Sequence, residues 1–289
     1  MRTRGRPIRG RGAVGHGLRV WLACLCLAGP AVAQAPPPRP PGESPEIVVR
    51  GESERALRAF VVAMAERGPT RQLGRWYQDI CPRVIGIDPA QAAAIEARIG
   101  AVAGSLELRP RTAGCPTTML VVVSAEAPAL AASFARRYPV TLGSEGRWRL
   151  ERFVASTLPV RWLSVTDPCG AGGCAMPNSR LALATRPAFQ AMIVIVDAAR
   201  IGGFGLGELS DYLAVVLLGS PPLEGNRPAT SVLSMFERPR DGGARFALTG
   251  EDRAFLQALY RSRASATGQQ QRDAIARRLR RDAAQGRRD

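Results

Sequence analysis

Glu208 and Asp211 are the two carboxylates in this sequence best placed for acid–base chemistry. They stand three residues apart near the start of an apolar stretch, so on a helix they share one face. Such a pair can hydrolyse a glycoside or act together with a serine. A structural role is the other interpretation, because acids in the first turns of a helix interact favourably with its dipole and its free N–H groups. We favour the structural role and keep the catalytic one as the alternative.

The other side chains favour binding over catalysis. All 40 basic residues are Arg, and the single histidine, His16, lies in a segment that we expect to be removed. A mature chain without imidazole or amine side chains has no histidine base and no Schiff-base lysine. A zinc site needs four Cys or His ligands, so we predict no metal and no cofactor. Core packing and groove lining are equally open for the aromatic residues Trp76, Tyr77, Trp148 and Trp162.

Residues 1–33 have the features of a secretory signal peptide. Six Arg and no acid lie in residues 2–19, an apolar run covers 18–27, and small residues precede a cleavage point after Ala33. We therefore expect a periplasmic or secreted protein. No later stretch reaches the roughly 18 apolar residues of a membrane-spanning helix, so none is predicted.

Four cysteines would remain after cleavage: Cys81, Cys115, Cys169 and Cys174. An even number in an oxidising compartment predicts two disulfides. Three pairings are possible, and we favour Cys81 with Cys115 and Cys169 with Cys174. The second pair encloses only Gly-Ala-Gly-Gly, which bends easily enough to bring the two ends together.

The pattern along the mature chain predicts a single α+β domain with a small mixed sheet flanked by helices. Six Pro residues make 34–45 an extended linker, the domain covers 46–261, and 262–289 form an Arg-rich tail. We expect helices over 53–67, 88–103, 127–138, 146–156, 208–218 and 249–261. Strands are expected over 118–124, 160–166, 180–185 and 191–196, with the last one central.

The tail carries much of the positive charge. The formal net charge is +16, of which the signal peptide and residues 261–289 account for +6 each. We expect a solvated, partly helical or disordered tail, whose two apolar residues are too few to dock as core and whose removal leaves the domain folded. As a functional hypothesis, it binds an anionic envelope surface; a nucleic-acid partner is not expected. The candidate surface-binding residues are Arg272, Arg277, Arg278, Arg280 and Arg281.

Several motifs stand out along the chain: the runs 193–197, 209–214, 234–236 and 248–260, together with Cys-Pro at 81 and 115. Together they resemble a group of uncharacterised secreted bacterial proteins. A strand, a helix, a Ser-Met turn and a Leu-Thr-x-x-Asp helix ending in Leu-Tyr are also similar to the second half of a zincin metalloprotease domain. In that family the helix carries His-Glu-x-x-His, whereas the matching helix here has no His. The resemblance implies a degenerate, zinc-free zincin-like domain kept for binding or scaffolding.

Two functional hypotheses follow. The first is a non-enzymatic envelope binding or interaction protein, whose partner is an anionic envelope surface or another protein. The alternative is a carboxylate-dependent hydrolase that uses Glu208 and Asp211 on peptide or glycan. A solvent-filled cleft shared by these two carboxyl groups would favour the alternative.

Overall fold

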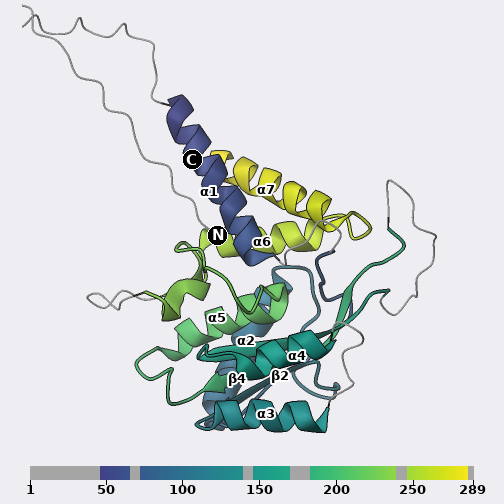
Figure 1. Ribbon diagram of the computed structural model, residues 1–289, viewed down its shortest axis with the longest axis vertical. Helices are drawn as coiled ribbons and strands as arrows, with labels where there is room; N and C mark the ends of the chain where they lie inside the picture. The colour runs from purple at the N-terminus through teal and green to yellow at the C-terminus, as the bar shows by residue number, and fades with distance from the viewer. Residues whose placement is uncertain (1–45, 66–71, 139–145, 170–182, 239–245, 286–289) are drawn as a thin grey trace, which may run out of the picture. The chain divides into compact units, whose positions relative to one another are not determined.

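A computed structural model describes residues 46–65, 72–138, 146–169, 183–238 and 246–285, all within the compact unit Pro45–Asp289 (Figure 1). A four-stranded sheet in the order β1-β2-β4-β3 forms its centre. Strands β1, β2 and β4 are parallel, and β3 pairs antiparallel with β4 at the edge. The fold is therefore α+β with a small mixed sheet, as predicted. The strands are β1 (Pro82–Ile85), β2 (Met119–Ser124), β3 (Val160–Asp167) and β4 (Ala188–Asp197).

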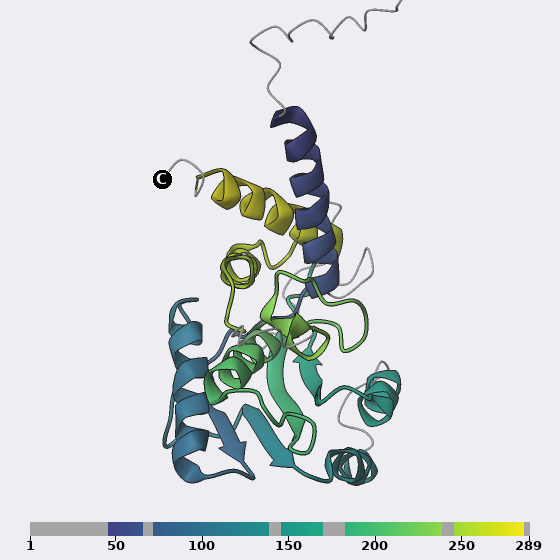
Figure 2. The ribbon, with the colours of Figure 1, turned by 90° about the vertical axis from the view of Figure 1, so that its left-hand side faces the viewer.

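Helices cover both faces of the sheet (Figure 2). Alternate residues of a strand point to opposite faces. Trp162 and Val194 belong to the larger core cluster, which contains α2 (Pro89–Gly104) and α5 (Leu206–Gly219). Their neighbours Leu163 and Ile195 pack instead with α3 (Ala127–Arg137) and α4 (Gly146–Ala155).

Local sequence explains where α2 begins and why α5 is buried. Asp88 caps α2, since its side chain accepts hydrogen bonds from the N–H groups of Ala90 and Gln91, and Pro89 occupies the first turn. Helix α5 is buried from Glu208 to Leu218, as expected of a helix that is apolar on all sides.

A layer of three helices lies beyond α5 (Figure 1). It consists of α1 (Glu46–Met64), α6 (Gly250–Arg261) and α7 (Gly268–Gln285), and α7 contacts both of the others. The expected undocked tail is wrong for α7, because Ile275 and Leu279 are fully buried in the main core cluster. A narrow apolar stripe is enough to dock this helix, since α1 and α6 together provide an apolar face for it.

Polar side chains attach the start of α7 and the connection before it to the extended segment of residues 72–76, which follows α1 in the chain. The carboxamide of Gln271 is buried, accepts a hydrogen bond from the N–H of Leu73 at 2.7 Å and donates to the carbonyl of Arg263 at 3.1 Å. Gln72 donates to the carbonyls of Ala264 and Ala266 at 2.8 and 3.0 Å. Hydrogen bonds therefore tie the connection between α6 and α7 to the body of the domain.

Besides α7, other elements differ from the sequence prediction, and β1 is a strand that was not expected. Helix α1 begins at Glu46, earlier than expected, and the described part of the predicted strand 180–185 is not in the sheet. The N–H of Leu183 instead donates to the carbonyl of Ser265 at 2.8 Å, and Thr185 bonds to Gln72. These polar partners outside the sheet replace the strand ladder that the alternating pattern predicts.

The Cys81–Cys115 disulfide is present, with the two Cα atoms 6.2 Å apart, and it joins the residue before β1 to the loop before β2. Cys174 lies outside the described residues, and so does the predicted Cys169–Cys174 pair. Among the described residues, no helix has both the length and the apolar character needed to cross a membrane.

Loss of the Cys81–Cys115 disulfide is expected to lower the free energy of unfolding by about 4 kcal/mol. The bond closes a loop with a sequence separation of 34, and chain-entropy arguments give a stabilisation of this size. Urea unfolding of a Cys81→Ser/Cys115→Ser double variant, compared with the oxidised parent, measures it. An unchanged unfolding midpoint would mean that this crosslink does not restrict the unfolded chain.

Candidate functional site

Glu208 and Asp211 serve as hydrogen-bond acceptors for backbone groups. Both are buried in the first turns of α5. Glu208 accepts from the N–H of Gly205 at 2.6 Å and from that of Phe246 at 2.8 Å. Asp211 accepts from the N–H of Leu248 at 2.8 Å and forms an ion pair with Arg98 at 2.6 Å. The two carboxylates therefore hold the segment before α6 against α5, whereas the sequence predicts a role within their own helix, which only the bond from Gly205 to Glu208 represents.

The five candidate arginines of the tail do not form one surface. Arg272 is buried, and burial lowers the pKa of its guanidinium. Arg278 is half-buried, and Arg280 forms an ion pair with Glu54 of α1 at 3.2 Å. Arg277 and Arg281 are exposed. Because α7 is docked, some of the five arginines lie on the packed side of the helix and the others on its outer side.

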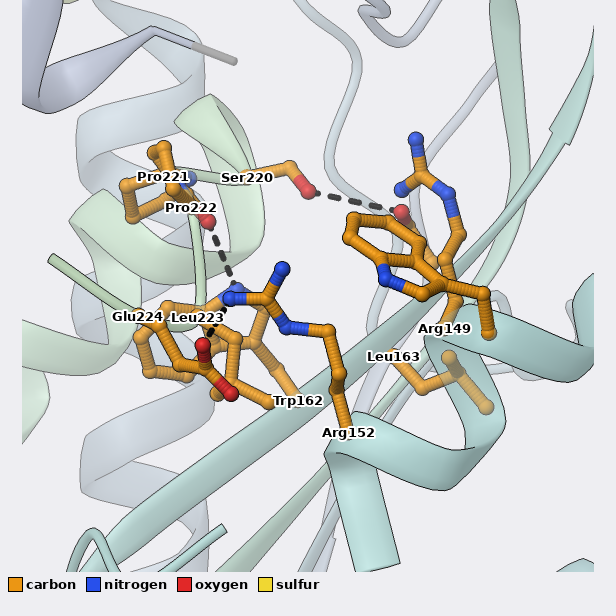
Figure 3. Close-up of a pocket in the computed structure, with 11 residues that line it drawn as sticks. Arg149, Arg152, Trp162, Leu163, Ser220, Pro221, Pro222, Leu223 and Glu224 are labelled. Carbon is orange, nitrogen blue, oxygen red and sulfur yellow. Dashed lines mark hydrogen bonds and ion pairs between the residues drawn. The ribbon is translucent and has the colours of Figure 1, made fainter. Parts of the chain in front are cut away.

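A pocket of about 330 Å³, which we call the β3 pocket, lies beside the edge strand β3 (Figure 3). Helix α4 forms one wall and the segment after α5 forms the other, while β3 lies between them. Neither Glu208 nor Asp211 lines it. The lining residues are Trp148, Arg149, Arg152, Trp162, Leu163, Ser164, Ser220, Pro221, Pro222, Leu223 and Glu224.

Arg227 fixes the wall formed by residues 221–224. Its guanidinium donates to the carbonyls of Pro222 and Leu223, both at 2.7 Å, and lies 5.2 Å from the centre of the Trp162 ring. The indole N–H of Trp162 donates to the carbonyl of Pro221 at 2.9 Å. The wall is therefore held in place before any ligand arrives.

An ion pair between Arg152 and Glu224 joins the two walls (Figure 3). The Arg152 guanidinium also stacks 4.6 Å from the centre of the Trp148 ring. The side chains of Arg152 and Glu224 are 32% and 56% exposed, and ion pairs of such exposure contribute about 0–1 kcal/mol to stability. Little free energy is therefore needed to separate these two residues.

The outer edge of β3 borders this pocket, where Trp162 and Ser164 are 4% and 5% exposed. The N–H of Met192 donates to the carbonyl of Thr118, so Met192 points its backbone groups toward β2. Residues opposite each other in an antiparallel pair point their backbone groups either both inward or both outward. Ser164 is opposite Met192 and Trp162 is opposite Val194, so their N–H and C=O groups point away from β4. In the described part of the chain these groups have no backbone partner.

The chemistry of the β3 pocket is that of recognition. Guanidinium groups, indole rings and two serine hydroxyls converge there, and the Ser220 hydroxyl lies 3.4 Å from that of Ser164. Glu224 is the one carboxylate among the lining residues. In the described ranges, no three His, Cys, Asp or Glu side chains gather in a way that could hold a metal ion.

Sequence reasoning identified only part of this pocket. Trp148 and Trp162 stand out by type, and groove lining is one of their two open roles. Arg152 and Glu224 lie 72 residues apart, and no local pattern signals their meeting. The chain matches no protein family, no curated protein and no solved structure with which it was compared.

Proposed function

We propose that the protein is a non-enzymatic binding protein of the bacterial envelope, exported to the periplasm or secreted, and that the β3 pocket is its binding site. The observation that carries the proposal is the engagement of Glu208 and Asp211 with backbone N–H groups, while neither residue lines the β3 pocket. Their acceptor positions are occupied by the fold itself.

Three features of the chain support this role. The β3 pocket has a volume at the lower end of the range typical of small-ligand sites and combines apolar walls with a few polar groups. The signal-peptide pattern and the Cys81–Cys115 disulfide agree with an oxidising compartment. Arg277 and Arg281, exposed on α7, support an anionic envelope surface as an additional contact.

An affinity experiment with the mature chain, residues 34–289, tests the proposal. The immobilised protein is expected to retain a component of an envelope extract, and a Trp148→Ala/Arg152→Gln double variant is expected to lose it. Arg83→Gln is the matched control, because it removes the same charge at an exposed position on β1, the opposite edge of the sheet. Equal retention by the wild type and the double variant would contradict the assignment of the site.

A hydrolysis assay tests the alternative function directly. We expect no turnover of peptide or glycan substrates by the mature protein. Turnover that is lost in an Asp211→Asn variant of unchanged circular dichroism would contradict the binding role and favour a carboxylate-dependent hydrolase.

A further inference from the structure

We propose that the β3 pocket binds the carboxyl end of an extended peptide, an inference that rests on the binding role proposed above. The peptide adds as a strand to the outer edge of β3, and its terminal carboxylate takes the place of Glu224 beside Arg152.

The backbone of β3 supplies the first part of this recognition. Trp162 and Ser164 both line the pocket, and both point their N–H and C=O groups away from β4, on the outer edge of the sheet. An extended peptide satisfies such groups by forming a ladder with the edge strand, and this mode of binding depends little on side chains. The walls on either side of β3 restrict access to one strand.

The charges of the pocket supply the second part. Arg149 and Arg152 lie three residues apart on the same face of α4, and Arg152 brings its guanidinium to Glu224, the one carboxylate among the lining residues. A carboxylate pairs with guanidinium more strongly than a neutral group does. Because Glu224 is more than half exposed, it can return to water when a ligand carboxylate replaces it.

The size of the pocket favours a chain end over a segment that passes through. Within the pocket, only two residues of β3, Trp162 and Ser164, can pair their backbone with a peptide. The volume of about 330 Å³ is small for a ligand site. Trp148 and Leu223 provide apolar surface for the side chains next to the terminus.

Peptide libraries provide the test. Random hexapeptides with a free carboxyl end, and the same library with an amidated end, are passed over the immobilised mature protein. We expect the free-carboxyl library to be retained about tenfold more strongly, the difference typical of a charged hydrogen-bond partner. Equal retention of the two libraries, or retention of neither, overturns the proposal.

Two pocket variants should change the affinity in opposite directions. Arg152→Gln is expected to weaken binding of the retained peptides about tenfold, because it removes the cation. Glu224→Gln is expected to tighten binding about threefold, because it removes the internal competitor for Arg152. Arg83→Gln, the same charge change at the opposite edge of the sheet, should leave the affinity unchanged.

Amide exchange identifies the strand pairing. The bound peptide should slow hydrogen exchange at the N–H groups of Trp162 and Ser164, and unchanged exchange there overturns the proposed strand pairing.

Failure of the peptide test does not decide the proposed function. If neither library binds while the envelope component is still retained in a manner that depends on Trp148 and Arg152, the peptide inference is wrong and the binding role stands.

Discussion

Removal of residues 262–289 is expected to lower the free energy of unfolding by at least about 5 kcal/mol. The truncation deletes the buried side chains of Ile275 and Leu279, and the loss of such a side chain costs about 2–5 kcal/mol. It also removes the carbonyl and hydroxyl of Ser262, which accept hydrogen bonds at 2.9 Å from Arg75. Arg75 is 3% exposed, and burial already lowers the pKa of its guanidinium.

Chemical unfolding of the mature chain with and without residues 262–289 measures this effect. A smaller perturbation, Ile275→Ala/Leu279→Ala, should itself cost about 4 kcal/mol or more. Arg277→Ala/Arg281→Ala on the exposed side of the same helix should cost no more than about 1 kcal/mol. A truncated protein with an unchanged unfolding midpoint would show that α7 is dispensable for the fold, as the sequence alone suggests.

The elements that the sequence predicts well are those whose signals are local. The Asp88-Pro89 pair marks the start of α2, and the apolar run before Ser124 marks β2. Helix α5 is apolar nearly throughout, and it is buried accordingly. In each case the stabilising contact or the burial pattern can be inferred from residues within one element.

The elements that the sequence misses depend on distant partners. Strand β1 is only four residues long and begins with Pro82, and a proline at the first position of an edge strand is its one local sign. The docking of α7 depends on Leu73 and on α1, which lie some two hundred residues away in the chain. Composition describes α7 as a charged tail, whereas its buried face becomes apparent only when its partners are known.

The candidate site shows the same limit. The spacing of Glu208 and Asp211 places both at the start of a helix, as expected. That spacing is shared by catalytic carboxylates and by helix-capping ones. The backbone N–H groups of Phe246 and Leu248 decide between the two roles, and they belong to a segment more than thirty residues away in the chain. The β3 pocket likewise draws its walls from separate segments, so residue types alone indicate its members without bringing them together.

Asp252→Ala is expected to lower the free energy of unfolding by about 3–6 kcal/mol, because it removes the shared acceptor for three donors. Asp252 is fully buried in the first turn of α6. Its carboxylate accepts from the hydroxyl of Ser231 at 2.6 Å, from the N–H of Val232 at 2.9 Å and from that of Thr249 at 3.2 Å. A buried donor left without a partner costs about 1–3 kcal/mol.

The position of these donors explains why one side chain has so large an effect. Ser231 caps the 3₁₀ helix η1 (Val232–Phe236), and Val232 is its first residue, whereas Thr249 caps α6. Asp252 therefore joins two elements that make no other described side-chain hydrogen bond to each other. Asp252→Asn should cost less, since its side-chain carbonyl still accepts a hydrogen bond. Glu251→Ala, an acid in the same turn that is only half-buried, should cost less than about 1 kcal/mol. Urea unfolding of the three variants measures the series, and equal losses for Asp252→Ala and Glu251→Ala would mean that the helix dipole, and not the shared acceptor, accounts for the stabilisation.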